Sequence, residues 1–394
     1  MKRTLKKFLT MCVAGSLVFA LAACNGGEQK ATETKKETAQ ESEVILLGGI
    51  GPTTGAAAMY GNSAFNGANL AVDEINAKGG VLGKQIKLEI MDDKNEAVDA
   101  VSAFNKLSEE GMVGLIGAVT SKPSDAVAQA AVEGGLPVIT PTGTAQSITT
   151  YGENIFRAPF IDPYQGVVMA QYAKDELKVT KVAVIKNTSS DYSDGLATAF
   201  VEKAKELGLE VVAEEAYGES DVDFKSQLTK IAQAAPEALF IPDYYQKIAL
   251  IAPQARQAGL TAKLIGGDGW DGIIQSINPD DLGSVEGAYF ANTFALDDPD
   301  EKVQAFINGY SAKYKENPQS FSALGYDAVY LMANAIEKAG ELDSAKIVEA
   351  IKTTDYTGVT GQFKFDENRN PIKSVFMTTI KDGKYKLEKK FSAE

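Results

Sequence analysis

Hydrophobic positions change their spacing along the chain in a regular order. From Glu43 to Gly266, short runs rich in β-branched residues alternate with longer segments in which apolar residues recur every three or four positions. The first spacing is typical of buried strands and the second of amphipathic helices. This alternation predicts βαβ units with mostly parallel sheets, so the expected fold class is α/β. The pattern restarts after Phe156-Arg157-Ala158-Pro159, which indicates two doubly wound lobes.

The predicted elements of the two lobes can be given by residue range. In the first lobe we expect strands at 44–48, 86–91, 113–117 and 137–140 and helices at 64–77, 97–109 and 124–133. In the second lobe we expect strands at 181–186, 210–216, 238–241 and 263–266 and helices at 164–177, 195–207, 224–234 and 247–258.

The last third of the chain changes pattern again. Helical spacing at 302–314, 322–339 and 344–352 is followed by short strand patterns at 362–365, 374–380 and 384–389. We place the helices on the first lobe, since no new set of core strands follows them, and the strands on the second lobe as a returning hairpin. The predicted N-terminal lobe is therefore 43–160 plus 293–357, and the C-terminal lobe is 161–292 plus 358–394. Three crossings of this kind form a hinge.

The first 42 residues carry a different signal. Four basic residues precede an apolar run that ends in Leu21-Ala22-Ala23-Cys24, which resembles the lipobox of bacterial lipoproteins. We predict that residues 1–23 are a lipoprotein signal peptide that is removed, and that Cys24 is lipidated and anchors the chain at the outer face of the membrane. The alternative is an ordinary cleavage site with a Cys beside it by chance. Residues 24–42 are polar and predicted to be a disordered tether.

Composition excludes several classes of function. The chain has 394 residues, too many for one compact core, and 53 acidic against 39 basic residues. Four of the basic residues lie in the predicted signal peptide, which leaves 35 and a net charge of −18 for the mature chain. Such an acidic surface repels nucleic acid. Histidine is absent, which removes Ser-His and Cys-His nucleophile pairs and His-ligated metal centres.

Two local patterns resemble known ligand sites without matching them. The glycine-rich run at 48–55 reads G-x-G-x-x-x-G, and Pro52 removes a backbone donor that a phosphate cradle needs. The run at 366–370 resembles the start of a calcium loop, but Pro371 replaces the required Gly and Met377 the required Glu. We therefore expect no nucleotide, cofactor or metal.

Two pairs of neighbouring carboxylates, Asp92-Asp93 and Asp297-Asp298, could act as acid and base only inside a cleft. We interpret them as residues of solvated loops.

Polar side chains follow the predicted strands of the first lobe. Ser121 and Ser124 come after the strand at 113–117, and Thr142 and Thr144 come after the next strand. Ligands of open α/β sheets bind at the carboxyl ends of strands, and hydroxyls beside backbone N–H groups suit a carboxylate. The alternative is that these residues only cap helices.

In the second lobe, Tyr192 and Tyr244 follow two predicted strands, and Gly266-Gly267-Asp268-Gly269-Trp270 follows a third. Asp268 could pair with an ammonium while Trp270 covers an apolar or cationic group.

Several motifs together resemble the type I periplasmic binding proteins, most of all the branched-chain amino-acid receptors of ABC importers. The motifs are Gly51-Pro52-Thr53-Thr54-Gly55 with Tyr60-Gly61, Gly67-Ala68-Asn69-Leu70-Ala71-Val72-Asp73-Glu74-Ile75-Asn76, Gly79-Gly80-Val81-Leu82-Gly83-Lys84, and Tyr326-Asp327-Ala328. The resemblance covers nearly all of residues 43–390. It implies the fold of that family, two lobes joined by a three-crossing hinge.

The resemblance also implies roles for individual residues. Ser121, Thr142 through its backbone, and Thr144 would hold the carboxylate and ammonium of an amino acid, and Tyr244 and Asp268 would close on the same groups.

Tyr60 and Tyr192 resemble positions that line the side-chain pocket. The chain departs from the family at Asp268, where Glu is frequent, and at Trp270, which is bulkier than expected. These departures put the choice of side chain in doubt.

The function expected from these patterns is that of an extracytoplasmic solute-binding protein of an ABC importer. It would bind a branched-chain or other apolar α-amino acid between its lobes as a monomer, without a cofactor, and deliver it to the permease. We expect no catalysis. One alternative is a sensory ligand-binding protein, although no membrane helix or signalling domain is expected to follow. The other is a hydrolase acting through Asp92 or Asp268, which lacks a nucleophile and base pair.

Overall fold

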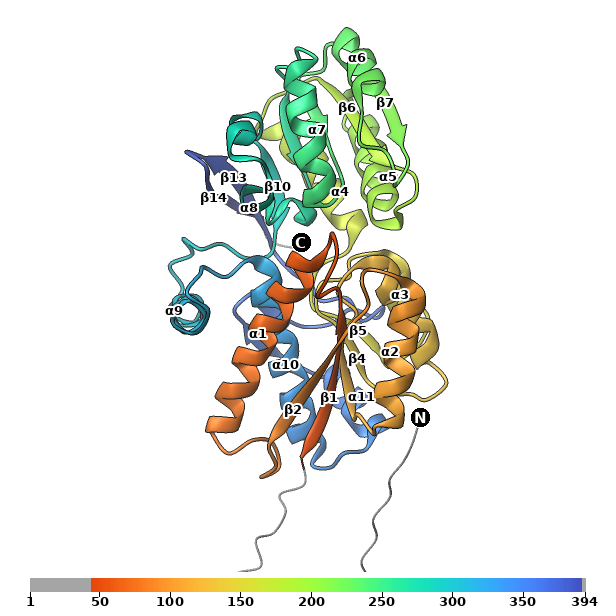
Figure 1. Cartoon of the computed structure of the whole chain (residues 1–394), viewed down its shortest axis with the longest axis vertical. Coiled ribbons are helices and arrows are strands. Elements are labelled where there is room, and N and C mark those ends of the chain that lie inside the picture. The colour runs from red at the N-terminus through yellow and green to blue at the C-terminus, as the bar shows by residue number, and fades with distance from the viewer. Residues whose placement is uncertain (1–43, 392–394) are drawn as a thin grey trace, which may run out of the picture. The chain divides into compact units, whose positions relative to one another are not determined.

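The structure of the protein is a computed structural model that describes residues 44–391. The predicted signal peptide, the lipidation site Cys24 and the whole of the predicted tether lie outside the described residues. Within them, strands and helices alternate as the sequence predicts, and the strands form two large sheets (Figure 1).

The first sheet is entirely parallel and has the strand order β2-β1-β3-β4-β5. Its strands are β1 Ile45–Gly51, β2 Ile86–Asp92, β3 Gly114–Gly117, β4 Val138–Thr140 and β5 Ile155–Arg157. The helices around it are α1 Ala58–Ala77, α2 Ala97–Glu109, α3 Ser121–Ala131, α9 Glu301–Tyr314, α10 Ser320–Ala339 and α11 Ser344–Lys352. Alternate side chains explain the two layers, because Leu47 and Ile116 pack with α1 and α10 while Leu115 and Val138 pack with α2 and α3.

The second sheet has seven strands in the order β14-β13-β10-β9-β8-β6-β7, of which β13 and β14 run antiparallel to their neighbours. Its strands are β6 Lys181–Asn187, β7 Glu210–Tyr217, β8 Ala238–Phe240, β9 Lys263–Gly266, β10 Tyr289–Asn292, β13 Val375–Lys381 and β14 Lys384–Phe391. Its helices are α4 Asp162–Asp175, α5 Asp191–Glu206, α6 Lys225–Ala234, α7 Tyr245–Gln257 and α8 Ile273–Ser276. Val182 and Val184 face α4 and α5, whereas Ala183 and Ile185 face α6 and α7.

The chain passes between the sheets at three places. It leaves the first sheet after β5, returns after β10 to the helices packed on the first sheet, and enters the second sheet again at β13. The predicted fold class is therefore confirmed. A small hairpin of β11 (Tyr356–Gly358) and β12 (Gly361–Phe363) contacts α10 and does not join the second sheet, contrary to the single returning hairpin that we expected. The lobe boundaries stay a prediction, and these contacts favour a third crossing after Phe363.

Helices α1 and α10 approach each other closely because glycine faces a backbone at two points. A Cβ atom on Gly67 would lie 1.8 Å from the carbonyl oxygen of Ser322, and one on Gly325 would lie 2.0 Å from that of Ala64. This contact places the start of α10, with Phe321, beside the start of α1.

The structure also differs from the expected elements in ways that affect the site. It adds the short strands β5 and β10, which the sequence pattern did not indicate. It starts α1, α3 and α5 three to six residues earlier than predicted. Tyr60, Ser121 and Tyr192 therefore lie on the first turns of helices rather than in loops.

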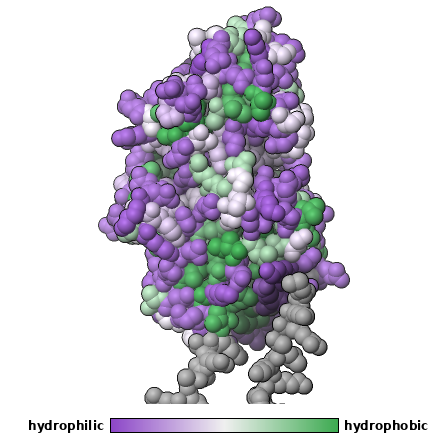
Figure 2. All heavy atoms as spheres, in the orientation of Figure 1, coloured by the Kyte–Doolittle hydropathy of each residue, from purple (hydrophilic) through white to green (hydrophobic). Residues whose placement is uncertain are grey.

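The surface in the view of Figure 2 is mostly hydrophilic, with hydrophobic side chains in groups in both the upper and the lower half of the view. Among the residues that the structure describes, no helix is both long and apolar enough to cross a membrane.

Candidate ligand-binding site

The residues predicted at the ends of strands come together around one small pocket. It is lined by Val119, Thr120, Ser121, Thr142, Thr144, Tyr192, Tyr244, Asp268, Gly269 and Phe321, and its space of about 210 Å³ is partly open to solvent. The loops after β3 and β4 supply one wall, and residues after β6, β8 and β9 supply the other.

The wall from the first sheet offers uncharged hydrogen-bond donors. Ser121 is the first residue of α3, and its Oγ accepts from the backbone N–H groups of Thr144 at 3.4 Å and Ala145 at 3.3 Å. The structure gives no acceptor for its own hydroxyl hydrogen among the described residues. The hydroxyl of Thr142 donates to the carbonyl oxygen of Val119, so what Thr142 offers a ligand is its backbone.

Arg157 on β5 stabilises this wall from behind. The side chain is fully buried and donates to the carbonyl oxygens of Gly143 at 3.0 Å and Ala145 at 2.9 Å. Burial lowers the pKa of Arg157 to about 10, which still leaves it a cation at neutral pH. Its carbonyl contacts fix the loop whose N–H groups contact Ser121, and its charge favours an anion at this wall.

The wall from the second sheet carries a buried carboxylate. Asp268 follows β9, is 5% exposed, and its Oδ1 accepts from the hydroxyl of Tyr192 at 2.8 Å and from Nε2 of Gln165 at 3.1 Å. Tyr192 in turn accepts from the backbone N–H of Gly269 at 2.9 Å. Burial raises the pKa of Asp268 to about 6, opposed by the two hydrogen bonds. Asp268 is therefore mostly ionised at neutral pH.

Aromatic rings close the pocket between the two walls. Tyr60 stacks on Phe321 with ring centroids 4.3 Å apart, and Tyr192 stacks on Tyr244 at 4.7 Å. The hydroxyl of Tyr60 donates to the carbonyl oxygen of Gly269 at 2.6 Å, and so joins α1 to the turn that holds Asp268. Tyr192, Tyr244 and Phe321 line the pocket and give an apolar surface for the remainder of a ligand. Tyr60, which we expected in the lining, packs on Phe321 and is not among the lining residues.

Trp270 is not brought to the pocket. Its side chain is fully buried, its Nε1 donates to the carbonyl oxygen of Ile241 at 2.9 Å, and its ring stacks on Phe290. This placement does not fit the expectation that Trp270 covers a ligand group. The pattern misled because Asp268 and Trp270 are two residues apart in a short 3₁₀ turn, where their side chains point in different directions.

A wider cleft of about 1,390 Å³ adjoins the small pocket. The two spaces share Ser121, Tyr192 and Tyr244 as lining residues, and the cleft continues outward past Lys94, Lys122 and Asp191 among others. We interpret the cleft as the entrance and the small pocket as the site, because the buried charge and the convergent donors lie in the pocket.

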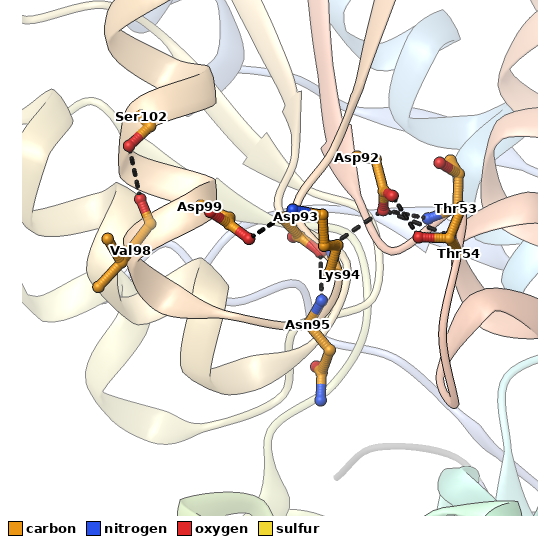
Figure 3. A network of polar contacts seen from close by, with 9 residues as sticks. All are labelled: Thr53, Thr54, Asp92, Asp93, Lys94, Asn95, Val98, Asp99 and Ser102. Carbon is orange, nitrogen blue, oxygen red and sulfur yellow. Dashed lines mark hydrogen bonds and ion pairs between the residues drawn. The ribbon is translucent and has the colours of Figure 1, made fainter.

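The two carboxylate pairs have structural contacts of their own. Asp92 accepts from the backbone N–H groups of Thr53 at 2.8 Å and Lys94 at 3.0 Å, and Asp93 accepts from that of Asn95 at 2.8 Å (Figure 3).

The interpretation of these pairs as solvated loop residues is wrong for two of the four. Asp93 is fully buried, and burial raises its pKa to about 7. Asp298 is 3% exposed, and its Oδ2 lies 2.7 Å from Nζ of Lys390. Neither residue lines the small pocket.

The described residues contain no group of three or more His, Cys, Asp or Glu side chains that could hold a metal ion. The run at 366–370 forms a turn, in which the Asp366 carboxylate accepts from the backbone N–H groups of Asn368 and Asn370, each at 2.8 Å.

Sequence reasoning missed several residues in or behind the site, among them Arg157, Asp162, Gln165 and Phe321. Phe321 and Gln165 lie in helical patterns, where an apolar or neutral residue gives no functional signal. Arg157 and Asp162 lie at the predicted boundary between lobes, and two charged residues of opposite sign at that place were the available signal.

Comparison with known proteins identifies the family. The family model described as periplasmic binding protein matches residues 44–384. A leucine-, isoleucine-, valine-, threonine- and alanine-binding protein of Pseudomonas aeruginosa is 29% identical over 368 residues, which are 93% of this chain and 92% of the relative. A Leu/Ile/Val-binding protein of Rhizobium johnstonii is 35% identical over 77% of this chain and 82% of its own.

Solved structures show the same relationship. A leucine-binding protein from Thermotoga maritima superposes with a TM-score of 0.83 at 34% identity, covering 88% of this chain and 99% of its own. A branched-chain amino-acid transporter substrate-binding protein from Streptococcus pneumoniae, in complex with isoleucine, gives 0.82 at 35% identity, covering 89% and 99%. The chain therefore belongs to the periplasmic binding protein family, and its role is that of a substrate-binding protein.

Proposed function

We propose that this chain binds a free α-amino acid with a branched or other apolar side chain in the small pocket. The observation that carries the proposal is the position of the buried carboxylate of Asp268 in the same pocket as Ser121 and Thr144. A free amino acid presents a carboxylate and an ammonium on one carbon, and these walls offer donors for the first and an anion for the second. The ring of Phe321, which lines the pocket, suits an apolar side chain. The printed names of the relatives and of the isoleucine complex support the same class of ligand.

The wider role we propose is delivery of this ligand to an ABC permease at the outer face of the membrane. The ligand would be released unchanged, by a monomer that closes when contacts to both walls favour the closed state.

Isothermal titration tests the ligand. We expect leucine, isoleucine and valine to bind, the corresponding α-keto acids to bind far more weakly because they lack the ammonium, and lysine and glutamate not to bind. Recovery of unchanged amino acid after incubation checks that no reaction occurs. Failure of every amino acid to bind, with the protein folded, would refute the proposal.

Membrane attachment through Cys24 is a separate proposal with its own test. The full-length chain should fractionate with membranes, and Cys24→Ala should release it, because two or more acyl chains are the expected anchor. A Cys24→Ala chain that is still cleaved before residue 24 and stays equally membrane-bound would contradict it.

A further inference from the structure

A residue outside the pocket lining holds the carboxylate of Asp268 in place. Gln165 lies on the first turn of α4 and is fully buried. Its Oε1 accepts from the backbone N–H of Asp268 at 2.9 Å, and its Nε2 donates to Oδ1 of Asp268 at 3.1 Å. The backbone N–H can only donate, so this contact fixes which end of the amide faces it and turns Nε2 toward the carboxylate.

The contacts on Asp268 are uneven between its two oxygens. Oδ1 accepts from both Gln165 and Tyr192, whereas among residues 44–391 no side chain donates to Oδ2. Asp268 lines the pocket, so the oxygen without a side-chain donor is the one left for a ligand. A carboxylate held by one oxygen in this way presents the other in a fixed direction.

Gln165 is itself connected to the opposite wall. Its Nε2 also lies 3.4 Å from Oδ1 of Asp162, and the backbone N–H of Asp162 donates to the carbonyl oxygen of Thr144 at 3.0 Å. Asp162 is 1% exposed, and its Oδ2 has no partner among the described side chains and backbone groups. Asp162 and Gln165 follow the first crossing between the sheets, so this chain of contacts links the two walls through that crossing.

We propose that Gln165, itself in contact with Asp162, is a positioning residue that aims the free oxygen of Asp268 at the ligand ammonium. The proposal rests on the amino-acid function proposed above. Without the amide, Asp268 would lose one of its two side-chain donors and would be free to turn toward Asp162.

Several charged or titratable groups around Asp268 affect its ionisation. They are Asp162 on α4, Tyr192 on α5, Tyr244 at the start of α7, Asp271 after the 3₁₀ turn, and Tyr60 on α1. Burial raises the pKa of Asp162 as well as that of Asp268. Two acids so close compete for protons, and the donor from Gln165 favours ionisation of Asp268.

The test compares Gln165→Leu with wild type in titrations of leucine and of its α-keto acid between pH 5 and pH 8. We expect leucine affinity to fall about tenfold at pH 7, as for a lost hydrogen bond to a charged group, with little change for the keto acid. We also expect the pH at which leucine affinity begins to fall to move upward, because the neutral form of Asp268 is favoured. Gln165→Glu, which keeps the size of the side chain, should move that pH upward too by adding a negative charge.

Gln254→Leu is the matched control. Gln254 on α7 also uses both ends of its amide, accepting from the backbone N–H of Phe224 at 2.8 Å and donating to the carbonyl oxygen of Val222 at 2.9 Å, but it does not line the pocket. We expect it to lose stability without a change in affinity.

The outcomes separate the positioning role from a structural one. Leucine affinity within twofold of wild type and an unmoved pH profile in Gln165→Leu would overturn the proposal. An equal loss for leucine and keto acid with an unmoved profile would also overturn it, since that is what damaged folding gives.

Failure of wild type to bind any amino acid would refute the proposed function instead. In that event, the positioning role of Gln165 can still be tested by measuring the pKa of Asp268 with carboxyl-carbon NMR in the ligand-free protein. A higher pKa in Gln165→Leu or Gln165→Glu supports the positioning role, and an unchanged pKa refutes it.

Discussion

The two walls of the pocket differ in how they carry charge. At the first wall, which comes from the first sheet, the groups facing the pocket, such as Ser121, are neutral, and the buried cation Arg157 lies behind them. At the second wall, which comes from the second sheet, the anion Asp268 faces the pocket, and the neutral side chains of Gln165 and Tyr192 donate hydrogen bonds to it. A carboxylate therefore meets hydroxyls and N–H groups, whereas an ammonium meets a full charge. The comparison teaches that the two ends of one ligand should respond to mutation and pH in different ways.

Removing the charge of the second wall should have the largest effect. Asp268→Asn leaves a ligand ammonium buried without an anion, and breaking a buried charge pair costs about 3–5 kcal/mol, or roughly two to four decades in affinity. Titration with leucine and its α-keto acid should show this loss for leucine and a far smaller one for the keto acid. Asp191→Asn, at an exposed position of the outer cleft, is the control. Leucine affinity within threefold of wild type would show that the ammonium does not lie at Asp268.

Removing the hydroxyl of the first wall should have the next largest effect. Ser121→Ala deletes the hydroxyl and leaves the N–H groups of Thr144 and Ala145 without their acceptor. We expect a loss of about 1.5–3 kcal/mol, roughly tenfold to a hundredfold in affinity.

The loss in Ser121→Ala should be the same for leucine and for its keto acid, because both carry the carboxylate. Ser102→Ala, at an exposed serine on α2, serves as the control. A loss of affinity for leucine alone would contradict this assignment, because it would place the ammonium rather than the carboxylate at the first wall.

Lowering the pH should weaken leucine binding only through protonation of Asp268 at the second wall. The pKa of Asp268 is about 6 in the folded protein against 3.8 ordinarily. Leucine affinity should therefore be constant above pH 6 and fall roughly tenfold for each unit below it, until the ligand complex itself takes up the proton. The affinity of the keto acid should not fall over that range. A flat profile for leucine between pH 7 and pH 5 would contradict the assignment.

The same shift affects the stability of the empty protein with the opposite sign. Between pH 3.8 and pH 6 the folded state binds more protons at Asp268 than the unfolded chain does, so the stability contributed by this residue falls as pH rises through that window. The cost of burying the ionised group is fully present above pH 6. Empty Asp268→Asn should therefore melt at a higher temperature than wild type at pH 7.5 and approach it at pH 4. Lower stability of Asp268→Asn at pH 7.5 would show that the carboxylate stabilises the fold.

Trp270 should have the smallest effect on affinity. Trp270→Phe loses the hydrogen bond to Ile241 and leaves a cavity, for a cost of about 1–3 kcal/mol in the free energy of unfolding. Leucine affinity should stay within twofold of wild type, as measured by titration below the melting temperature. A large loss of leucine affinity at an unchanged free energy of unfolding would show that Trp270 does take part in ligand binding.

The sequence predicted the elements best where helix and strand patterns were long and uninterrupted. The predicted bounds of α2, β9 and α11 agree with the structure because apolar residues and helix formers mark them from end to end. The predicted starts of α1 and α5 are late because polar residues, such as Asn62 and Asp194, interrupt the apolar spacing near the start of each helix. β5 and β10 have only three and four residues, too few for an alternating pattern to be recognised.

The site could be predicted in part for a related reason. Residues such as Ser121 and Asp268 stand directly after strands, where topology alone places them at one edge of a sheet. Gln165 acts through a contact with Asp268, 103 positions along the chain, and no local spacing marks a contact of that kind. The direction of the Trp270 side chain depends on the 3₁₀ turn, which only the three-dimensional structure shows.

The burial of Trp270 also determines which part of this molecule tryptophan fluorescence can monitor. It is the single tryptophan of the chain and lies in the core of the second sheet. Indole emission excited apart from the tyrosines therefore follows the packing around that one sheet, whereas the first sheet contributes no signal. Circular dichroism, by contrast, follows the helices of both. If the halves lose structure together, the two spectroscopic transitions coincide, and if the first sheet melts alone, dichroism changes while the emission stays that of a buried indole.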